Sequence, residues 1–227
     1  MDRIIVPSNY LKRMVVGWGV NPARVKVIYN ALPPDTVTSD LSQAEARARL
    51  NLSDAPLLLT AARLHPWKGV DHLIAVLAQA PQVRLIVAGD GPMRGALEQQ
   101  AATLGVQERV QFLGQVPHEQ MPLYMKAADY LAVYSGYEGL SHTLLEGLRA
   151  GTPVIASDKG GNPEVVRHNV NGLLVPYVDV DALAATLHTA FQPGKRADLA
   201  ANSALGMERF AFEPMIEATN LALRSCL

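Results

Sequence analysis

A repeated pairing of a short apolar run with a segment of helical periodicity is the feature that most constrains this chain. Six such pairs follow one another between residues 57 and 191. The apolar runs do not alternate with polar residues, which is expected when helices cover both faces of a sheet. The repeat therefore predicts an α/β fold with a doubly wound, parallel, Rossmann-like sheet. The predicted pairs are Leu57–Ala62 with Val70–Ala78, Leu85–Ala88 with Met93–Leu104, Val110–Leu113 with Met121–Ala127, Tyr130–Val133 with Thr143–Arg149, Val154–Ala156 with Pro163–Arg167, and Leu173–Val175 with Ala182–Phe191.

The segment before this repeat has a different organisation. It predicts a strand at Ile4–Val6, a helix from Asn9 to Trp18 and a second strand at Val25–Ile28. Pro33 and Pro34 mark a boundary, because proline cannot donate to a strand ladder and disfavours helix in the residue before it. We expect a linker at about residues 30–41, followed by a helix from Ser42 to Leu50. The predicted parts are a strand–helix–strand unit at 1–32, the α/β domain at 33–210, and a terminal helix at 211–227.

Composition and charge exclude several classes of partner. Twenty Lys and Arg residues against 21 Asp and Glu residues leave a net charge of -1, so no general field attracts nucleic acid. No apolar run approaches the roughly 20 residues that cross a bilayer. The single cysteine, Cys226, closes no disulfide within the chain and fits a reducing compartment. We expect a cytoplasmic protein, and peripheral attachment to the inner membrane surface stays open.

Two cations follow the first strand of the repeat. Ligands of parallel α/β sheets bind beyond the carboxyl ends of the strands, so these loops hold the candidate site residues. Arg63 and Lys68 lie five residues apart on a loop that opens a helix. A guanidinium fork, an ammonium charge and the N-terminus of a helix together suit a diphosphate. The same two residues also fit solvated surface cations beside a helix cap.

The next strand ends in Gly89-Asp90-Gly91-Pro92. The glycines allow close approach of the backbone, and proline is favoured in the first turn of a helix. The pattern lacks the third glycine of the dinucleotide fingerprint and is not on the first strand, which argues against a nicotinamide-binding domain. An ordinary tight turn explains it better when it is taken alone.

Two carboxylates, Glu138 and Glu146, flank the start of a later helix. If this helix begins near Ser141, Glu146 lies in its second turn and leans back toward the crevice. A carboxylate in that position can accept hydrogen bonds from both hydroxyls of a ribose. Between the two acids, the N–H groups of Ser141, His142 and Thr143 are free to bind phosphate oxygens. Glu146 alone would be an ordinary surface residue, so the interpretation depends on the pair.

The sequence predicts no metal site. Asp179-Val180-Asp181 resembles a metal-binding Asp-x-Asp motif, but it directly precedes a helix, where aspartate is an expected cap. His65, His118 and His142 lack the spacing of metal ligands, and we interpret them as polar loop residues.

The order of these motifs resembles the carboxyl-terminal half of glycosyltransferase family 4, enzymes of the GT-B fold that transfer a sugar with retention of configuration. The resemblance covers nearly the whole chain. It implies that Arg63 and Lys68 hold the donor diphosphate, that Glu146 holds the ribose and that Glu138 holds the transferred sugar. It also implies base recognition by backbone groups around Val116, no metal or other cofactor, and a UDP-linked donor, because uridine donors are common in the family. Matching motif segments are Val6-Pro7-Ser8, Val27-Ile28-Tyr29-Asn30, Arg63 to Gly69, Gly89 to Pro92, Phe112-Leu113-Gly114, Glu138 to Glu146 and Gly151 to Ala156.

The full set of residues implied for the donor site extends to its backbone neighbours. Catalytic roles are implied for Glu138, Arg63 and Lys68. The implied donor-binding residues are Arg63, Lys68, Gly91, Val116, Glu138, Gly139, Leu140, Ser141, His142, Thr143 and Glu146.

The departure from the family lies at the amino end. The family carries a second Rossmann-like domain there that binds the acceptor, and residues 1–32 resemble only its last elements. The resemblance therefore implies a donor-binding half whose acceptor, a glycan or glycolipid, is bound by the missing domain. It also implies exposed apolar surface, with self-association or a separate amino-terminal half as partner. Two alternatives stay open, namely a nucleotide-sugar-binding subunit or sensor without catalysis, and another GT-B enzyme such as a nucleotide-sugar epimerase.

Overall fold

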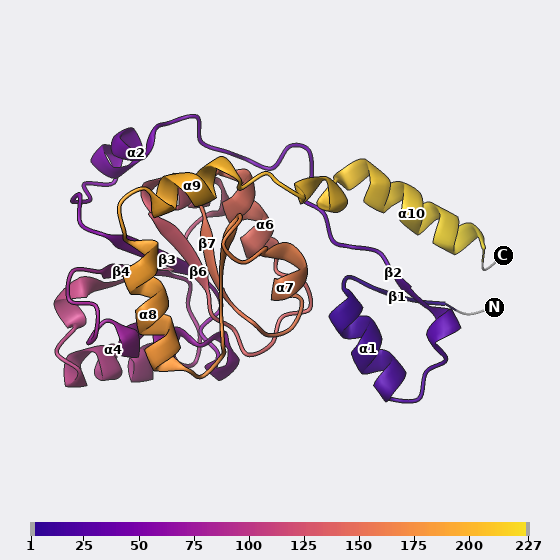
Figure 1. The fold of residues 1–227 in the computed structure, drawn as a ribbon, viewed down its shortest axis with the longest axis horizontal. Coiled ribbons are helices and arrows are strands. Elements are labelled where there is room, and N and C mark those ends of the chain that lie inside the picture. The colour runs from indigo at the N-terminus through magenta and orange to yellow at the C-terminus, as the bar shows by residue number, and fades with distance from the viewer. Residues whose placement is uncertain (1–2, 226–227) are drawn as a thin grey trace.

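The computed structural model of this chain describes residues 3–225, so Cys226 lies outside the described residues. A six-stranded parallel sheet forms the centre of the α/β domain, and a two-stranded parallel sheet lies near the amino end (Figure 1). The strands are β1 (Ile4–Val6), β2 (Val25–Val27), β3 (Leu57–Ala61), β4 (Arg84–Ala88), β5 (Val110–Gly114), β6 (Tyr130–Val133), β7 (Val154–Ser157) and β8 (Gly172–Val175).

Helices connect these strands in the order that the sequence predicts. The α-helices are α1 (Asn9–Gly17), α2 (Gln43–Arg49), α3 (Val70–Val76), α4 (Arg94–Thr103), α5 (Met121–Ala127), α6 (His142–Arg149), α7 (Asn162–Val165), α8 (Val180–Ala190), α9 (Lys195–Ala201) and α10 (Phe212–Arg224). Short 3-10 helices are η1 (Pro22–Arg24), η2 (Pro66–Lys68), η3 (Gln107–Arg109), η4 (His118–Gln120) and η5 (Met207–Phe210).

All six predicted strand–helix pairs are present, which confirms the predicted fold class. Several helix ends differ from the prediction by one or two residues, and one helix was not predicted. Helix α8 begins at Val180, two residues early, because the carboxylate of Asp179 caps it by accepting a hydrogen bond from the backbone N–H of Ala182 at 2.8 Å. The prediction that Asp179 is a cap is thereby confirmed. Helix α9 was not predicted, since only Leu199 of its seven residues is buried and its apolar periodicity is weak.

Helices cover both faces of the six-stranded sheet. Alternate residues of β3 point to opposite faces, so Leu58 packs in one core and Leu57 and Leu59 pack in the other. The first core is completed by apolar side chains of α3, α4 and α8, and the second by those of α5, α6 and α7. The inner strands are therefore buried on both sides, which explains their apolar sequences, whereas the edge strand β5 has Gln111 exposed.

The strand order β5-β4-β3-β6-β7-β8 places the first strand of the repeat in the middle of the sheet. The chain runs outward from β3 to β4 and β5 on one side, and then crosses to β6, β7 and β8 on the other. Leu59 of β3 pairs with Ile86 of β4 and with Leu131 of β6. The loops after β3 and β6 therefore diverge at a topological switch point, where sheets of this kind form a crevice.

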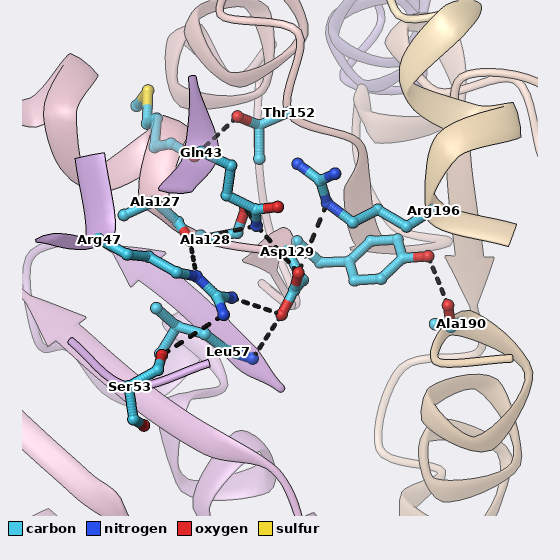
Figure 2. A network of polar contacts seen from close by, with 12 residues as sticks. Gln43, Arg47, Ser53, Leu57, Ala127, Ala128, Asp129, Thr152, Ala190 and Arg196 are labelled. Carbon is cyan, nitrogen blue, oxygen red and sulfur yellow. Dashed lines mark hydrogen bonds and ion pairs between the residues drawn. The ribbon is translucent and has the colours of Figure 1, made fainter. Parts of the chain in front are cut away.

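A polar network closes the opposite, amino end of the sheet (Figure 2). The carboxylate of Asp129, directly before β6, accepts hydrogen bonds from the Arg47 guanidinium, from the backbone N–H of Leu57 and from the Gln43 amide, at 2.8, 2.8 and 2.9 Å. Arg47 also donates from Nε to the carbonyl oxygen of Ala127 at 2.9 Å. The network thus fixes α2 and the starts of β3 and β6 to one another.

The β1–α1–β2 unit and α10 lie together at one end of the molecule, beyond the six-stranded sheet (Figure 1). The Lys26 ammonium group on β2 donates to the backbone oxygen of Ala218 on α10 at 3.4 Å. Residues 28–42 contain no helix or strand, which agrees with the predicted linker. The division into three parts at residues 32 and 210 stays a prediction.

Large apolar side chains are exposed on this end of the molecule, as the sequence predicts. Trp18 is 73% exposed, and Leu221 and Leu223 on α10 are 58% and 57% exposed. Self-association through these side chains stays a prediction. Among the helices of the described residues, none combines the length and the apolar character needed to span a bilayer.

Candidate functional site

Two adjacent hollows lie at the carboxyl end of the sheet, at the switch point between β3 and β6. The smaller has a volume of about 100 Å³ and the larger of about 380 Å³. Ala61, Ala62 and Thr143 line both, so the two hollows form one continuous site. Predicted site residues in the smaller hollow are Lys68, Glu138, Leu140, Ser141, His142 and Thr143, and those in the larger are Arg63, Val116, Thr143 and Glu146.

An ion pair between Lys68 and Glu138 forms one wall of the smaller hollow. The Lys68 ammonium nitrogen is 2.5 Å from the Oε1 atom of Glu138, and the side chains are only 22% and 14% exposed. The two residues are 70 positions apart in the sequence and come from the loops after β3 and β6. The structure therefore joins the predicted diphosphate-binding lysine to the glutamate expected to hold the sugar.

Main-chain contacts hold the Lys68 loop against the loop that follows β6. Gly69, which ends η2, has a left-handed φ of 66°, and a Cβ atom there would lie 2.0 Å from the carbonyl oxygen of Tyr134. Only glycine fits such an approach. The backbone N–H of Gly136 donates to the carbonyl oxygen of Trp67 at 2.7 Å. The cation is thus positioned by backbone geometry.

The Glu138 loop is held from its other side by the turn after β7. The backbone N–H of Gly161 donates to the carbonyl oxygen of Glu138 at 2.8 Å. Gly160 has a φ of 64°, and a Cβ atom there would lie 2.2 Å from that same oxygen. The predicted site residue Glu138 therefore depends on a segment, Gly160-Gly161, to which the sequence analysis gave no role.

The start of α6 supplies hydrogen-bond donors to the smaller hollow. Ser141 is the N-cap, and its hydroxyl accepts from the backbone N–H of Leu144 at 3.3 Å, which confirms that the helix begins there. Helix geometry leaves the N–H groups of His142 and Thr143 without an intrahelical acceptor. Both residues line the hollow, so these donors and the positive end of the helix dipole are available to an anion.

Glu146 lies in the second turn of α6 and lines the larger hollow, in the position that the sequence predicts. Burial raises the pKa of its carboxyl group above the ordinary value, and the nearby His118 and His142 partly oppose this shift. Arg63 lines the same hollow and is exposed. Its side chain has no hydrogen bond or ion pair among the described residues, so it offers an unpaired guanidinium group.

Three other predicted site residues occupy different places. Val116, which follows β5, lines the larger hollow together with residues at the carboxyl end of β4. Gly91 and Gly139 line neither hollow. A Cβ atom on Gly91 would lie 2.6 Å from the backbone oxygen of Leu64, so the absence of a side chain at Gly91 lets its backbone pack against the loop that carries Arg63. Gly139 contacts Leu11 of α1, and a Cβ atom there would lie 3.0 Å from the Cδ1 atom of that leucine.

The three histidines that the sequence analysis rejected as metal ligands make different contacts. His65 stacks on Trp67 with a centroid distance of 4.4 Å. His118 and His142 are the two that influence Glu146. In residues 3–225, no group of three or more His, Cys, Asp or Glu side chains is arranged to hold a metal ion.

Two functional candidates escaped the sequence analysis. Asn162 is fully buried and its amide donates to the hydroxyl of Ser157 at 3.1 Å, and that hydroxyl donates to the carbonyl oxygen of Ser135 at 2.5 Å. Glu164 accepts hydrogen bonds from α1 and from Tyr29, which follows β2, as described below. A sequence signal existed, because the segment from Gly160 to Glu164 begins four residues after the predicted strand Val154–Ala156, where ligand-binding loops of this fold lie.

This chain is similar in sequence and fold to several glycosyltransferases and to solved structures. Anabaena HepE, solved in complex with UDP-glucose, superposes with a TM-score of 0.90 and 31% identity over 99% of this chain and 64% of its own. A D-inositol 3-phosphate glycosyltransferase from Mycobacterium sp. strain JLS is 34% identical over 201 residues, 85% of this chain and 45% of its own. A GDP-mannose-dependent alpha-(1-6)-phosphatidylinositol monomannoside mannosyltransferase from Mycolicibacterium smegmatis is 33% identical over 182 residues, 73% of this chain and 48% of its own. The chain spans about half the length of these curated relatives.

The sequence pattern of a protein family matches residues 42–204, a segment that contains both hollows and every residue that lines them. The family is described as Glycosyl transferases group 1. This match confirms the coarser part of the resemblance inferred from the sequence, whereas membership of family 4 and retention of configuration stay predictions. Because the family pattern matches more than half of the chain, the chain belongs to the glycosyl transferases group 1 family.

Proposed function

We propose that this chain binds a nucleoside diphosphate hexose, with uridine as the base, and supplies the donor-binding part of a sugar transfer that retains configuration. The observation that carries the proposal is the pair of adjacent hollows at the switch point. One contains the Lys68–Glu138 ion pair and the start of α6, and the other contains Arg63 and Glu146. A nucleotide-sugar donor needs three kinds of partner side by side: a carboxylate for the sugar hydroxyls, positive groups for the diphosphate and a second carboxylate for the ribose.

Each part of the donor has a partner of matching chemistry. The free N–H groups at the start of α6, together with Lys68 and Arg63, bind the diphosphate. Glu146 accepts hydrogen bonds from the ribose hydroxyls, which offsets the cost of its burial. Glu138 accepts hydrogen bonds from the hydroxyls of the transferred sugar, and backbone groups around Val116 bind the edge of the base.

The chemical contribution of this site is stabilisation of the leaving diphosphate. Negative charge develops on the diphosphate as the bond to the sugar breaks. Fixed positive groups stabilise that charge without having to reorganise during the reaction. Lys68 and Arg63 supply formal charge, and α6 adds its dipole. We propose that these groups act without a divalent metal ion and that the acceptor is a glycan or glycolipid bound outside the two hollows.

The choice of base is supported by one neighbour and opposed by another. The HepE structure is described as a complex with UDP-glucose, and the Mycolicibacterium relative is described as GDP-mannose-dependent. We favour uridine because HepE, which was solved with UDP-glucose, superposes over 99% of this chain with a TM-score of 0.90.

Calorimetric titration of the full 227-residue chain tests the proposal directly. UDP, GDP and ADP are titrated with and without magnesium, into the unaltered protein and into the Glu146→Ala and Lys68→Ala variants. We expect UDP to bind without dependence on magnesium, and both variants to bind it at least about tenfold more weakly. The Lys195→Ala variant is the control, because Lys195 begins α9 near the other end of the sheet.

Each alternative result changes a specific part of the proposal. Preference for GDP corrects the base and leaves the site intact. A strict requirement for magnesium contradicts the metal-independent mechanism. Absence of binding by all three nucleotides contradicts the proposed donor site on this chain.

A further inference from the structure

Glu164 occupies an unusual position for a carboxylate on a short helix. It belongs to α7, directly after the Gly160-Gly161 turn that supports Glu138. Its Oε2 atom accepts hydrogen bonds from the backbone N–H of Asn9 at 2.9 Å and from the hydroxyl of Tyr29 at 3.0 Å. Its Oε1 atom accepts from the backbone N–H of Tyr10 at 2.8 Å. One side chain of the α/β domain therefore binds both the start of α1 and the residues after β2.

The charge of Glu164 suits this arrangement. Asn9 and Tyr10 are the first two residues of α1, so their N–H groups lack intrahelical acceptors and carry the positive end of the helix dipole. Burial opposes ionisation of Glu164, but the hydrogen bonds from Asn9, Tyr10 and Tyr29 outweigh it and hold the pKa of the carboxyl group below its ordinary value. The group is a carboxylate over the whole neutral range.

Helix α1, which Glu164 anchors, packs against the residues on either side of Glu138. The ring of Tyr10 meets the ring of Tyr137 edge to face, with centroids 6.0 Å apart. The side chain of Leu11 lies against Gly139, so closely that a Cβ atom on Gly139 would lie only 3.0 Å from the Cδ1 atom of Leu11. The Glu138 loop is thus enclosed between α1 on one side and the Gly160-Gly161 turn on the other.

We propose that Glu164 is a positioning residue for the sugar-binding part of the donor site, because it joins the two supports of the Glu138 loop into one rigid frame. This inference rests on the proposed function, in which Glu138 holds the transferred sugar. Glu164 does not line either hollow. It acts through α1 and the Gly160-Gly161 turn, whereas Arg63 and Glu146, the diphosphate and ribose partners that line the larger hollow, lie outside this frame.

If Glu164 positions the sugar-binding loop, its substitution should weaken binding of a nucleotide sugar more than binding of the nucleotide alone. A general loss of structure would weaken both. In the Glu164→Gln variant, one amide N–H group must face a backbone N–H group of α1, so at least one hydrogen bond is lost. We expect the dissociation constant for UDP to change less than about twofold and that for UDP-glucose to rise about tenfold. GDP and GDP-mannose replace this pair if the unaltered protein prefers guanine.

Two further variants keep the test decisive. Leu11→Ala removes the contact between α1 and Gly139 while leaving Glu164 in place, and we expect the same selective loss of affinity for the sugar conjugate. Glu217→Gln makes the same chemical change at an exposed position on α10 and is expected to bind both ligands as the unaltered protein does. Thermal unfolding and near-UV circular dichroism establish that each variant is folded, and Leu11→Ala carries the test if Glu164→Gln is not.

The possible failures are distinguishable. If the unaltered protein binds no nucleotide, the proposed function fails. If it binds both ligands and Glu164→Gln weakens them equally, or weakens neither, Glu164 has no positioning role and the inference is overturned while the proposed function stands.

Discussion

Two ion pairs lie at opposite ends of the same sheet and differ in what surrounds them. Arg47 and Asp129 meet at the amino end, before β6, with side chains 8% and 15% exposed. Lys68 and Glu138 meet at the carboxyl end, after β6, with side chains 22% and 14% exposed. Burial is therefore similar. The difference lies in their further partners, because the Asp129 carboxylate also binds Leu57 and Gln43, whereas the side chains of Lys68 and Glu138 have no other polar partner among the described residues.

This comparison separates a structural pair from a ligand-binding pair. Removing two charges from water is unfavourable unless the remaining hydrogen-bonding positions are also satisfied. At the amino end, protein groups satisfy them (Figure 2). At the carboxyl end they face an open hollow, so a ligand can satisfy them. Residue type and burial alone do not distinguish the two pairs, and the surroundings do.

The largest effect on stability is expected from Asp129→Ala. The change leaves Arg47 buried without its counter-charge and removes the acceptor of the Leu57 N–H group, so the free energy of unfolding should fall by about 3–5 kcal/mol. Urea unfolding followed by circular dichroism measures it. Asp40→Ala, at an exposed linker position, should change it by less than about 0.5 kcal/mol. A loss as small as that of the control would show that the network does not stabilise the fold.

A medium effect, on binding more than on stability, is expected from Lys68→Met. Water in the adjoining hollow can solvate the freed Glu138 carboxylate, so the loss of unfolding free energy should stay below about 2 kcal/mol. Loss of a charge-assisted hydrogen bond to the donor should weaken nucleotide binding by about 1.5–3 kcal/mol. Urea unfolding and calorimetry on one preparation give both values, with Lys195→Met as the matched control. A stability loss equal to that of Asp129→Ala would remove the distinction between the two pairs.

The smallest effect on stability is expected from Glu146→Gln, and its sign depends on pH. The pKa of Glu146 is raised in the folded protein by burial, with His118 and His142 opposing the shift, so the folded state holds its proton more tightly than the unfolded state. Stability contributed by the protonated group is therefore lost as pH rises from the ordinary value of 4.5 through the raised value. The glutamine variant should match the natural protein at pH 4 and exceed it at pH 7.

Thermal unfolding at the two pH values measures this difference, and Glu217→Gln serves as the exposed control. Nucleotide binding by Glu146→Gln should be weaker at pH 7 even though the fold is more stable. A variant that is less stable at pH 7 than at pH 4, relative to the natural protein, would contradict the assigned cause of the shift.

The fold was predictable because its signal is local. Most strands of the six-stranded sheet are runs of apolar residues buried on both faces, and a helix follows each strand in the sequence. Helix α9 escaped prediction because it buries only Leu199, so its pattern resembles a polar loop. The small discrepancies at helix ends reflect caps such as Asp179, which sequence periodicity does not register.

The candidate site was predictable in its members but not in its pairings. Arg63, Lys68, Glu138 and Glu146 stand out because they follow strands at the end of the sheet where ligands bind. Their division between two hollows depends on strand order, which the sequence does not state. Glu164 was missed because its partners, Asn9 and Tyr10, are 155 and 154 positions away. A carboxylate followed by a valine has no local mark of such contacts.

The backbone contacts at Gly69 and Gly160 have a consequence for how this site can change over time. Each brings one loop against a carbonyl oxygen of another, with no side chain between them. Exchange of neighbouring side chains leaves that spacing unchanged, so the pocket can acquire new preferences for sugar or base while the distances between its loops persist. The same contacts make the two glycines positions where almost every replacement disturbs the frame itself. The side chains of the site can therefore change, whereas the backbone contacts that set the distances between its loops cannot.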